Sequence, residues 1–283
     1  MTGNVAAVFL FEWKRALTLP RMTWWAVLAA FPVFIIGLIR FTAQTSPPRE
    51  LWGYFLFALI PMLVSMLGTL LWTTPAISAE LERRSWVYLT VRPHGGTAVL
   101  LGKYLAAVTW VIPPALVGLT IAVPLAATND TWRLWWTMVT FQPANQAAQA
   151  ATNESWLLWW TMARLVCLSC PAFAAIYLLI GTLMPRRAMV LAVAYTLIFE
   201  LIISFVPAVI NKLTVQYRLR ALLYEWCDLS MPGGSQSGVL SRIGDAPAWQ
   251  HIAILMLLTP TLLALSVAIL RWSEFSSSAE SDV

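Results

Sequence analysis

The chain has 283 residues, of which 59% are hydrophobic and 11% are charged. Because soluble domains are about 45–50% apolar and about 25% charged, this composition excludes an ordinary soluble protein and predicts an integral membrane protein. The formal net charge of +5 is typical of basic loops held at anionic lipid, so we expect membrane lipid and no nucleic acid as a partner.

The first segment, residues 4–21, has the pattern of an amphipathic helix that lies in the membrane interface. Apolar side chains recur there at helical spacing until Pro20, at Val5, Phe9, Trp13 and Leu17. A signal peptide carries its positive charges before the apolar run, whereas Lys14 and Arg15 follow it here. We therefore expect this helix to be retained.

Six apolar runs are long enough to cross about 30 Å of hydrocarbon, which takes about 20 residues. They cover residues 22–39, 51–74, 104–127, 165–184, 188–210 and 252–270. The predicted fold is therefore an all-α polytopic membrane protein with one transmembrane domain over 1–283, formed by the interfacial helix and six transmembrane helices. Prolines inside the spans, such as Pro113, Pro114 and Pro207, predict kinks.

The distribution of Lys and Arg predicts the orientation. The denser clusters fall on the side that holds Lys14, Arg15, Arg21, Arg83, Arg84, Arg92, Lys103, Arg186, Arg187 and Arg271. The other side holds Arg40, Arg49, Arg133, Lys212, Arg218, Arg220 and Arg242, spread over longer connections. By the positive-inside rule we expect both termini to be cytoplasmic. We also expect the chain to lie in the cytoplasmic (inner) membrane.

The predicted outer loop 128–164 contains two nearly identical octapeptides, TWRLWWTM at 131–138 and SWLLWWTM at 155–162. We interpret them as an aromatic belt at the outer interface, with a ligand-binding aromatic surface as the alternative. The second outer segment, 211–250, predicts a short interfacial or re-entrant helix followed by an exposed loop. The polar tail 273–283 predicts a disordered cytoplasmic end.

Sequence signatures of catalysis are mostly absent, so we expect no enzyme activity and no metal site in this chain. Its two histidines, His94 and His251, are far apart in sequence, and no hydrolase or zinc motif is present. The segment from Gly96 to Lys103 has one residue too many between its glycines for a phosphate loop and opens a span. Cys167 and Cys170 are interpreted as small buried hydrophobes.

The long polar segment 75–103 reads PAISAELERRSWVYLTVRPHGGTAVLLGK. It contains an acidic-basic run, an apolar stretch, a proline and a Leu-Gly-Lys that leads into the third span; its marked residues are Glu80, Glu82, Arg83, Arg84, Trp86 and Arg92. This order resembles the loop between spans two and three in permease subunits of type-2 ATP-binding cassette exporters. One difference is Arg84-Ser85, where that family commonly has Gly-Thr.

The resemblance implies a transmembrane subunit of an ATP-driven exporter, with ATP and Mg²⁺ on a separate ATP-binding cassette ATPase subunit. It also implies a second permease subunit, identical or homologous, and a cytoplasmic coupling loop at 75–103 that docks on the ATPase. Charge-assisted bonds and an aromatic side chain such as Trp86 suit such docking. The alternatives are a basic turn that contacts lipid headgroups, a membrane assembly or anchoring factor, and an intramembrane enzyme.

Glu200 is an ionisable residue in the predicted fifth span, where a charge costs about 2.5–3.5 kcal/mol. We expect its side chain to face the bundle or a dimer axis, protonated or paired, with Arg164 as one possible partner. Two roles stay open from the sequence: a gate or substrate-path residue, and a carboxyl that is hydrogen-bonded to a neighbouring helix for packing.

Overall fold

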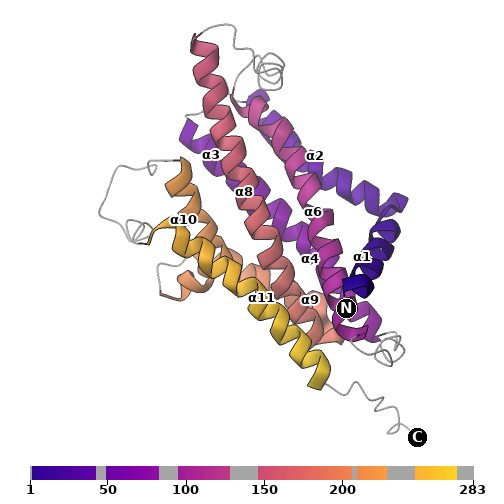
Figure 1. The fold of residues 1–283 in the computed structure, drawn as a ribbon. Helices are drawn as coiled ribbons and strands as arrows, with labels where there is room; N and C mark the ends of the chain where they lie inside the picture. The colour runs from indigo at the N-terminus through magenta and orange to yellow at the C-terminus, as the bar shows by residue number, and fades with distance from the viewer. Residues whose placement is uncertain are drawn as a thin grey trace, which may run out of the picture.

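The computed structural model describes residues 2–42, 49–82, 95–127, 146–205, 209–227 and 246–272, and within these ranges every element is helical (Figure 1). Five helical segments of the described chain are long and apolar enough to cross a membrane. They are Leu19–Thr42, Leu51–Ser78, Gly95–Ala126, Glu154–Leu183 and Ala248–Trp272. These helices agree with the predicted class, an all-α integral membrane protein.

The N-terminal region forms two helices, α1 (Thr2–Ala16) and α2 (Leu19–Thr42). The helix predicted across 4–21 therefore ends earlier than expected, and the first candidate span begins earlier than residue 22. Pro20 lies in the first turn of α2, where a residue without an N–H loses no helical hydrogen bond. Pro20 thus begins the second helix instead of ending the first.

The second candidate span combines α3 (Arg49–Phe57), the π-helix η1 (Ala58–Val64) and α4 (Ser65–Glu82). The wider turn contains Pro61, which has no N–H to donate. The backbone N–H of Ser65 donates to the carbonyl of Ile60, and its hydroxyl lies 3.3 Å from the same oxygen. The π turn keeps the helix continuous past the proline.

Helix α6 (Gly95–Ala127) starts nine residues before the predicted third span and continues through Pro113 and Pro114. Glycines on α4 and α6 allow its neighbours to approach closely. A Cβ at Gly118 would lie 2.9 Å from the carbonyl oxygen of Ala29 on α2, and a Cβ at Gly68 on α4 would lie 2.7 Å from a methyl of Val111. Small residues at such contacts are characteristic of helix packing in membranes.

Helix α8 (Gln146–Leu183) is the central helix of the bundle, and its span is 72% buried inside the protein (Figure 1). Residues 146–164, which the sequence analysis placed in an outer loop, form the first part of this helix. The second Trp-rich octapeptide lies on α8, where Trp159 and Trp160 have ring centroids 5.0 Å apart. The two rings meet edge to face; the first octapeptide, 131–138, lies outside the described residues.

The predicted fifth span, 188–210, is divided into short pieces. They are η2 (Pro185–Arg187) just before it, α9 (Ala188–Tyr195), the π-helix η3 (Thr196–Ile202), the 3₁₀ turn η4 (Ile203–Phe205) and η5 (Val209–Leu213). None of these pieces is long enough alone to span a membrane. The structure therefore does not confirm the count of six spans. The chain leaves regular α-helical geometry around Glu200, whose carboxylate binds the next helix.

The second outer segment contains one helix, α10 (Val215–Cys227), which is largely buried against α8 and α11 (Ala248–Trp272). This burial differs from the predicted interfacial helix, because both Leu219 and Leu222 are fully buried. Helix α11 is the opposite case, since only 11% of its span is buried and it lies on the outside of the bundle (Figure 1). The predicted loop after α10 and the tail 273–283 lie outside the described residues.

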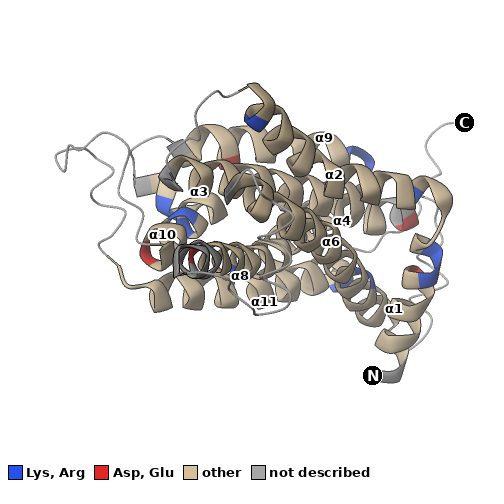
Figure 2. Cartoon of the chain, turned by 90° about the horizontal axis from the view of Figure 1, so that it is seen from above, with Lys and Arg blue, Asp and Glu red and all other residues tan. Residues whose placement is uncertain are grey.

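Helix α1, the end of α4, the start of α6 and the end of α11 gather toward one end of the bundle (Figure 1). Basic residues occur in the last turn of α1, at Lys14 and Arg15, and in the last turn of α11, at Arg271. Most of the chain seen in this view carries no charged residue (Figure 2). One group of charged residues surrounds α10 and another lies near the junction of α1 and α2 (Figure 2).

Candidate functional site

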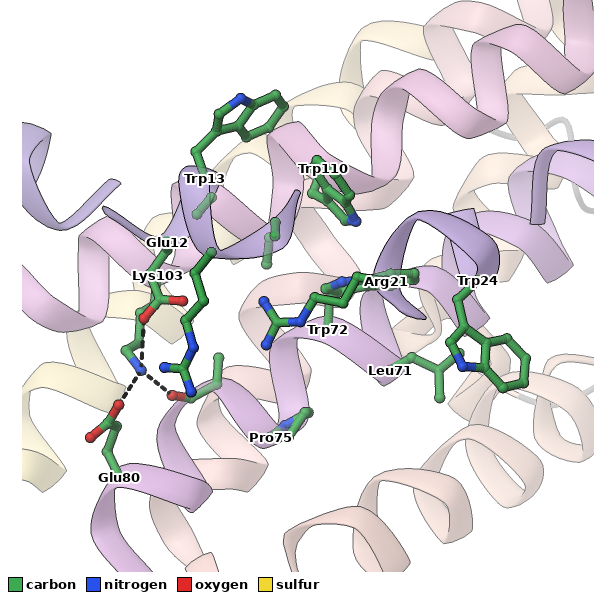
Figure 3. Close-up of a pocket in the computed structure, with 15 residues that line it drawn as sticks. Glu12, Trp13, Arg21, Trp24, Leu71, Trp72, Pro75, Glu80, Lys103 and Trp110 are labelled. Atoms are coloured by element: carbon green, nitrogen blue, oxygen red, sulfur yellow. Dashed lines mark hydrogen bonds and ion pairs between the residues drawn. The ribbon is translucent and has the colours of Figure 1, made fainter. Parts of the chain in front are cut away.

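Three helices meet around the side chain of Lys103, close to the basic end of the bundle. Its ammonium nitrogen lies 3.3 Å from Oε1 of Glu12 on α1 and 3.0 Å from Oε1 of Glu80 on α4. It also donates to the backbone carbonyl of Ala76, at 2.7 Å. We call these four residues the Lys103 junction; Figure 3 shows the ammonium with all three acceptors around it.

The Lys103 junction is shielded from solvent. The side chain of Lys103 is 7% exposed, and those of Glu12 and Glu80 are 16% and 23% exposed. An ammonium has three N–H donors, and the three acceptors match that number. Removing one member of a buried ion pair typically costs about 3–5 kcal/mol, because the remaining charge loses its partner in a poorly solvated place.

Gly102 explains why α1 can reach Lys103. A Cβ at this position would lie 2.7 Å from Cγ1 of Val8 and 3.1 Å from the carbonyl oxygen of Val5. Any larger residue would therefore push α1 away from α6. The Leu-Gly-Lys of the sequence thus has two physical roles: the glycine allows the helices to touch, and the lysine joins them.

Aromatic rings provide a second contact between the same two helices. The ring of Trp13 on α1 meets that of Trp110 on α6 edge to face, with centroids 5.2 Å apart. Phe9 stacks on Trp13 at 6.0 Å. Edge-to-face aromatic pairs contribute about 0.5–1.5 kcal/mol beyond the area that they bury. Helix α1 is therefore fixed to the bundle by a charge contact at Glu12 and an aromatic contact at Trp13, which reach α6 about two turns apart.

A cavity of about 390 Å³ lies beside the Lys103 junction, between α1, the start of α2, α4 and α6 (Figure 3). Its walls include four indole rings, of Trp13, Trp24, Trp72 and Trp110. Its charged lining comprises Glu12, Glu80 and Lys103 of the junction together with the guanidinium groups of Arg15 and Arg21.

The predicted coupling-loop residues fall into two groups. Glu80 lies in the final turns of α4 with its carboxylate turned to Lys103, so it holds the Lys103 junction instead of standing on an outward docking face. Glu82 is the last residue of α4. The remaining four predicted residues, Arg83, Arg84, Trp86 and Arg92, lie outside the described residues.

The sequence did not predict the pairing of Glu12 with Lys103. Glu12 lies in the predicted interfacial helix beside Lys14 and Arg15, and Lys103 leads into the predicted third span. Opposite charges that are expensive to bury alone are candidates for partners. Nothing local to either stretch, however, indicates that α1 returns to the start of α6.

Glu200 forms a second buried polar centre at the break in the predicted fifth span. The residue is fully buried, and its Oε1 accepts from the hydroxyl of Tyr195 at 2.9 Å. Its two oxygens also accept from the backbone N–H groups of Val215 at 3.3 Å and Gln216 at 3.0 Å. These N–H groups open α10 and have no partner within the helix, so Glu200 caps α10 from another segment.

Neighbouring bonds fasten the same region to the bundle. The hydroxyls of Tyr177 on α8 and Thr196 on η3 lie 2.7 Å apart, and the guanidinium of Arg220 on α10 donates to the carbonyl of Ser204. Arg164, the partner considered for Glu200, lies elsewhere, with its guanidinium carbon 5.7 Å from the ring centroid of Trp226. The geometry thus favours the packing role for Glu200 over an open site in a path.

No disulfide joins the three cysteines. Cys170 and Cys227 are buried, whereas Cys167, which the sequence predicted to be buried, is exposed. Within the described part of the chain no group of His, Cys, Asp and Glu residues is arranged to hold a metal ion. A scan against models of known protein families finds no match, and a search of curated proteins finds no significant relative.

Proposed function

We propose that this chain is the transmembrane subunit of an ATP-driven exporter and couples ATP hydrolysis on a separate subunit to movement of a substrate across the membrane. The observation that carries the proposal is the Lys103 junction. It ties together the two helices, α4 and α6, that directly flank segment 83–94. A force applied to that segment would therefore act on both helices at once.

Helix α1 belongs to the same mechanical unit, because Glu12 binds Lys103 and Gly102 receives α1 at close range. Helix α6 in turn touches α2 at Gly118 and α4 at Gly68. Packed interiors move as discrete bodies rather than deforming gradually. A displacement of segment 83–94 would thus be transmitted to α1, α2, α4 and α6 together, which is what coupling to an ATPase requires.

The proposed partners follow from this arrangement. An ATP-binding cassette ATPase subunit, which carries ATP and Mg²⁺, would contact Glu82, Arg83, Arg84, Trp86 and Arg92 at the cytoplasmic end. A second permease subunit, identical or homologous, would complete the transporter. The basic residues at this end of the bundle support a cytoplasmic orientation of both termini in the inner membrane.

The test is charge reversal at the coupling loop. The chain is co-expressed with a candidate ATP-binding cassette ATPase, chosen by a Walker A motif in a neighbouring reading frame, and the pair is reconstituted in liposomes. We expect Arg83→Glu/Arg84→Glu to leave expression unchanged but to reduce both ATPase pull-down and vanadate-sensitive turnover. If one contact is a buried charge pair, the binding free energy of the ATPase should fall by about 2–5 kcal/mol.

The matched control is Arg186→Glu/Arg187→Glu, which reverses two exposed charges in η2. Equal and small effects at the two places would contradict docking at segment 83–94. Pull-down of the ATPase without any stimulation of turnover would instead favour an assembly or anchoring factor.

A further inference from the structure

We infer that the cavity beside the Lys103 junction binds the anionic headgroup of a membrane lipid, with the acyl chains leaving along its aromatic rim. Three independent features of the lining support this inference: free positive charge, an unpartnered buried donor, and an apolar edge. Binding is a property of this chain alone, so the inference does not depend on the proposed transport function.

The positive charge available to a ligand comes from Arg15 and Arg21. Both line the cavity, and within the described residues neither guanidinium group has a hydrogen bond or an ion pair. The charge of Lys103, by contrast, is already taken up by Glu12 and Glu80. Figure 3 shows the guanidinium of Arg21 extended into the cavity toward the Lys103 junction. Guanidinium groups bind phosphate oxygens through paired N–H donors.

The buried donor is the indole Nε1 of Trp110. This side chain is only 4% exposed, and its nitrogen has no hydrogen-bond partner in the described structure. In Figure 3 the nitrogen lies on the side of the ring that faces Arg21. Because a buried N–H without an acceptor costs about 1–3 kcal/mol, this position favours a ligand that supplies an oxygen. The donor and the arginines together select an anionic oxygen group.

The apolar edge distinguishes a lipid from a small soluble anion. Trp24 lines the cavity and is 59% exposed, and Leu71, also in the lining, is exposed. Both belong to candidate spans, so the cavity opens beside surfaces suited to hydrocarbon. Pockets for compact ligands measure about 300–1,000 Å³, and 390 Å³ suits a headgroup but not two acyl chains.

The experiment uses the purified full-length chain in non-ionic detergent, with bound lipid counted by native mass spectrometry. Dioleoylphosphatidylglycerol is titrated beside dioleoylphosphatidylcholine, which has the same chains without net charge. We expect one phosphatidylglycerol to bind at least tenfold more tightly than phosphatidylcholine. In a third measurement, inorganic phosphate is added at millimolar concentration to the protein with bound phosphatidylglycerol. Displacement of the lipid by phosphate would show a plain anion site and overturn the assignment to lipid.

Variants locate the site. Arg15→Gln/Arg21→Gln should weaken phosphatidylglycerol binding by about fivefold for each arginine, the effect of a basic residue at an anionic surface. Lys14→Gln/Arg271→Gln removes the same number of charges from residues outside the lining and should change binding less than twofold. Trp110→Phe keeps an aromatic ring and removes the N–H donor, so the affinity for phosphatidylglycerol should fall about twofold to tenfold.

Equal losses in the two double variants would mean that lipid is attracted by overall charge, which would overturn the site. Equal binding of the two lipids would overturn it as well. If the double variant Arg15→Gln/Arg21→Gln is not monodisperse, the single variants provide the same comparison, because Arg15 is exposed and Arg21 is partly exposed.

Discussion

The ammonium nitrogen of Lys103 lies 3.0 Å from Oε1 of Glu80, although the two residues are 23 positions apart and belong to different helices. The segment between them is the one that the sequence marks as the coupling loop. The ion pair therefore closes that loop at its base, and Glu12 adds α1 to the closure.

Replacing Lys103 by Met should destabilise the protein by about 3–5 kcal/mol, because Glu12 and Glu80 would lose the ammonium that lies between them. Thermal unfolding in detergent measures the loss. The triple variant Glu12→Gln/Lys103→Met/Glu80→Gln removes all three charges and should recover much of it. A triple variant as unstable as Lys103→Met alone would show that packing, not charge, accounts for the effect.

Substitution of Gly102 by Val should detach α1 from α6. The new side chain would overlap Val8 and press on the Val5 carbonyl, and overpacking of this kind costs about 1–3 kcal/mol. Limited proteolysis should then cut within α1 faster than in the parent. Val8→Ala added to Gly102→Val should restore part of the protection, since it removes the side-chain overlap but not the backbone contact. Unchanged protection in Gly102→Val would disprove the close approach.

Glu200→Leu should loosen the start of α10, because the N–H groups of Val215 and Gln216 would lose their acceptors at about 1–3 kcal/mol each. Glu200→Gln keeps one acceptor oxygen and should be affected less. Hydrogen exchange at the first turn of α10 measures the difference. The control is Glu225→Leu, the same change at an exposed position of α10, which should leave exchange at that turn unaltered. Parent-like exchange in Glu200→Leu would rule out the capping role.

The topology is tested at two positions outside the described residues. A reporter fused at Ser276 should be cytoplasmic, and a cysteine placed at Ser237 should react with a membrane-impermeant reagent in intact cells, because the dense basic clusters lie on the side of the termini. The labelled cysteine is introduced into a variant in which the three native cysteines are replaced by serine, and that variant alone gives the background labelling. Labelling of position 237 only after lysis would reverse the orientation.

The apolar runs alone were sufficient to predict the membrane class and the approximate position of five spans. In hydrocarbon each helix must satisfy its own backbone hydrogen bonds, so a long apolar stretch has few alternatives to a helix. The ends of the spans were less well predicted: α6 starts earlier and α8 much earlier than expected, since polar and aromatic residues such as Gln146 and Trp156 continue a helix beyond the hydrocarbon.

The sequence by itself determined that this chain is helical and has stretches long and apolar enough to cross a membrane, because both properties follow from local periodicity and composition. It also singled out Glu200 as a charge inside a predicted span, and Gly102 and Lys103 as part of the Leu-Gly-Lys that leads into the third span. Only the tertiary structure decided what these residues contact. Glu12 meets Lys103 and Glu200 caps α10 because helices far apart in sequence pack together, and the pairing of helices depends on shape and on buried charge that no single segment specifies.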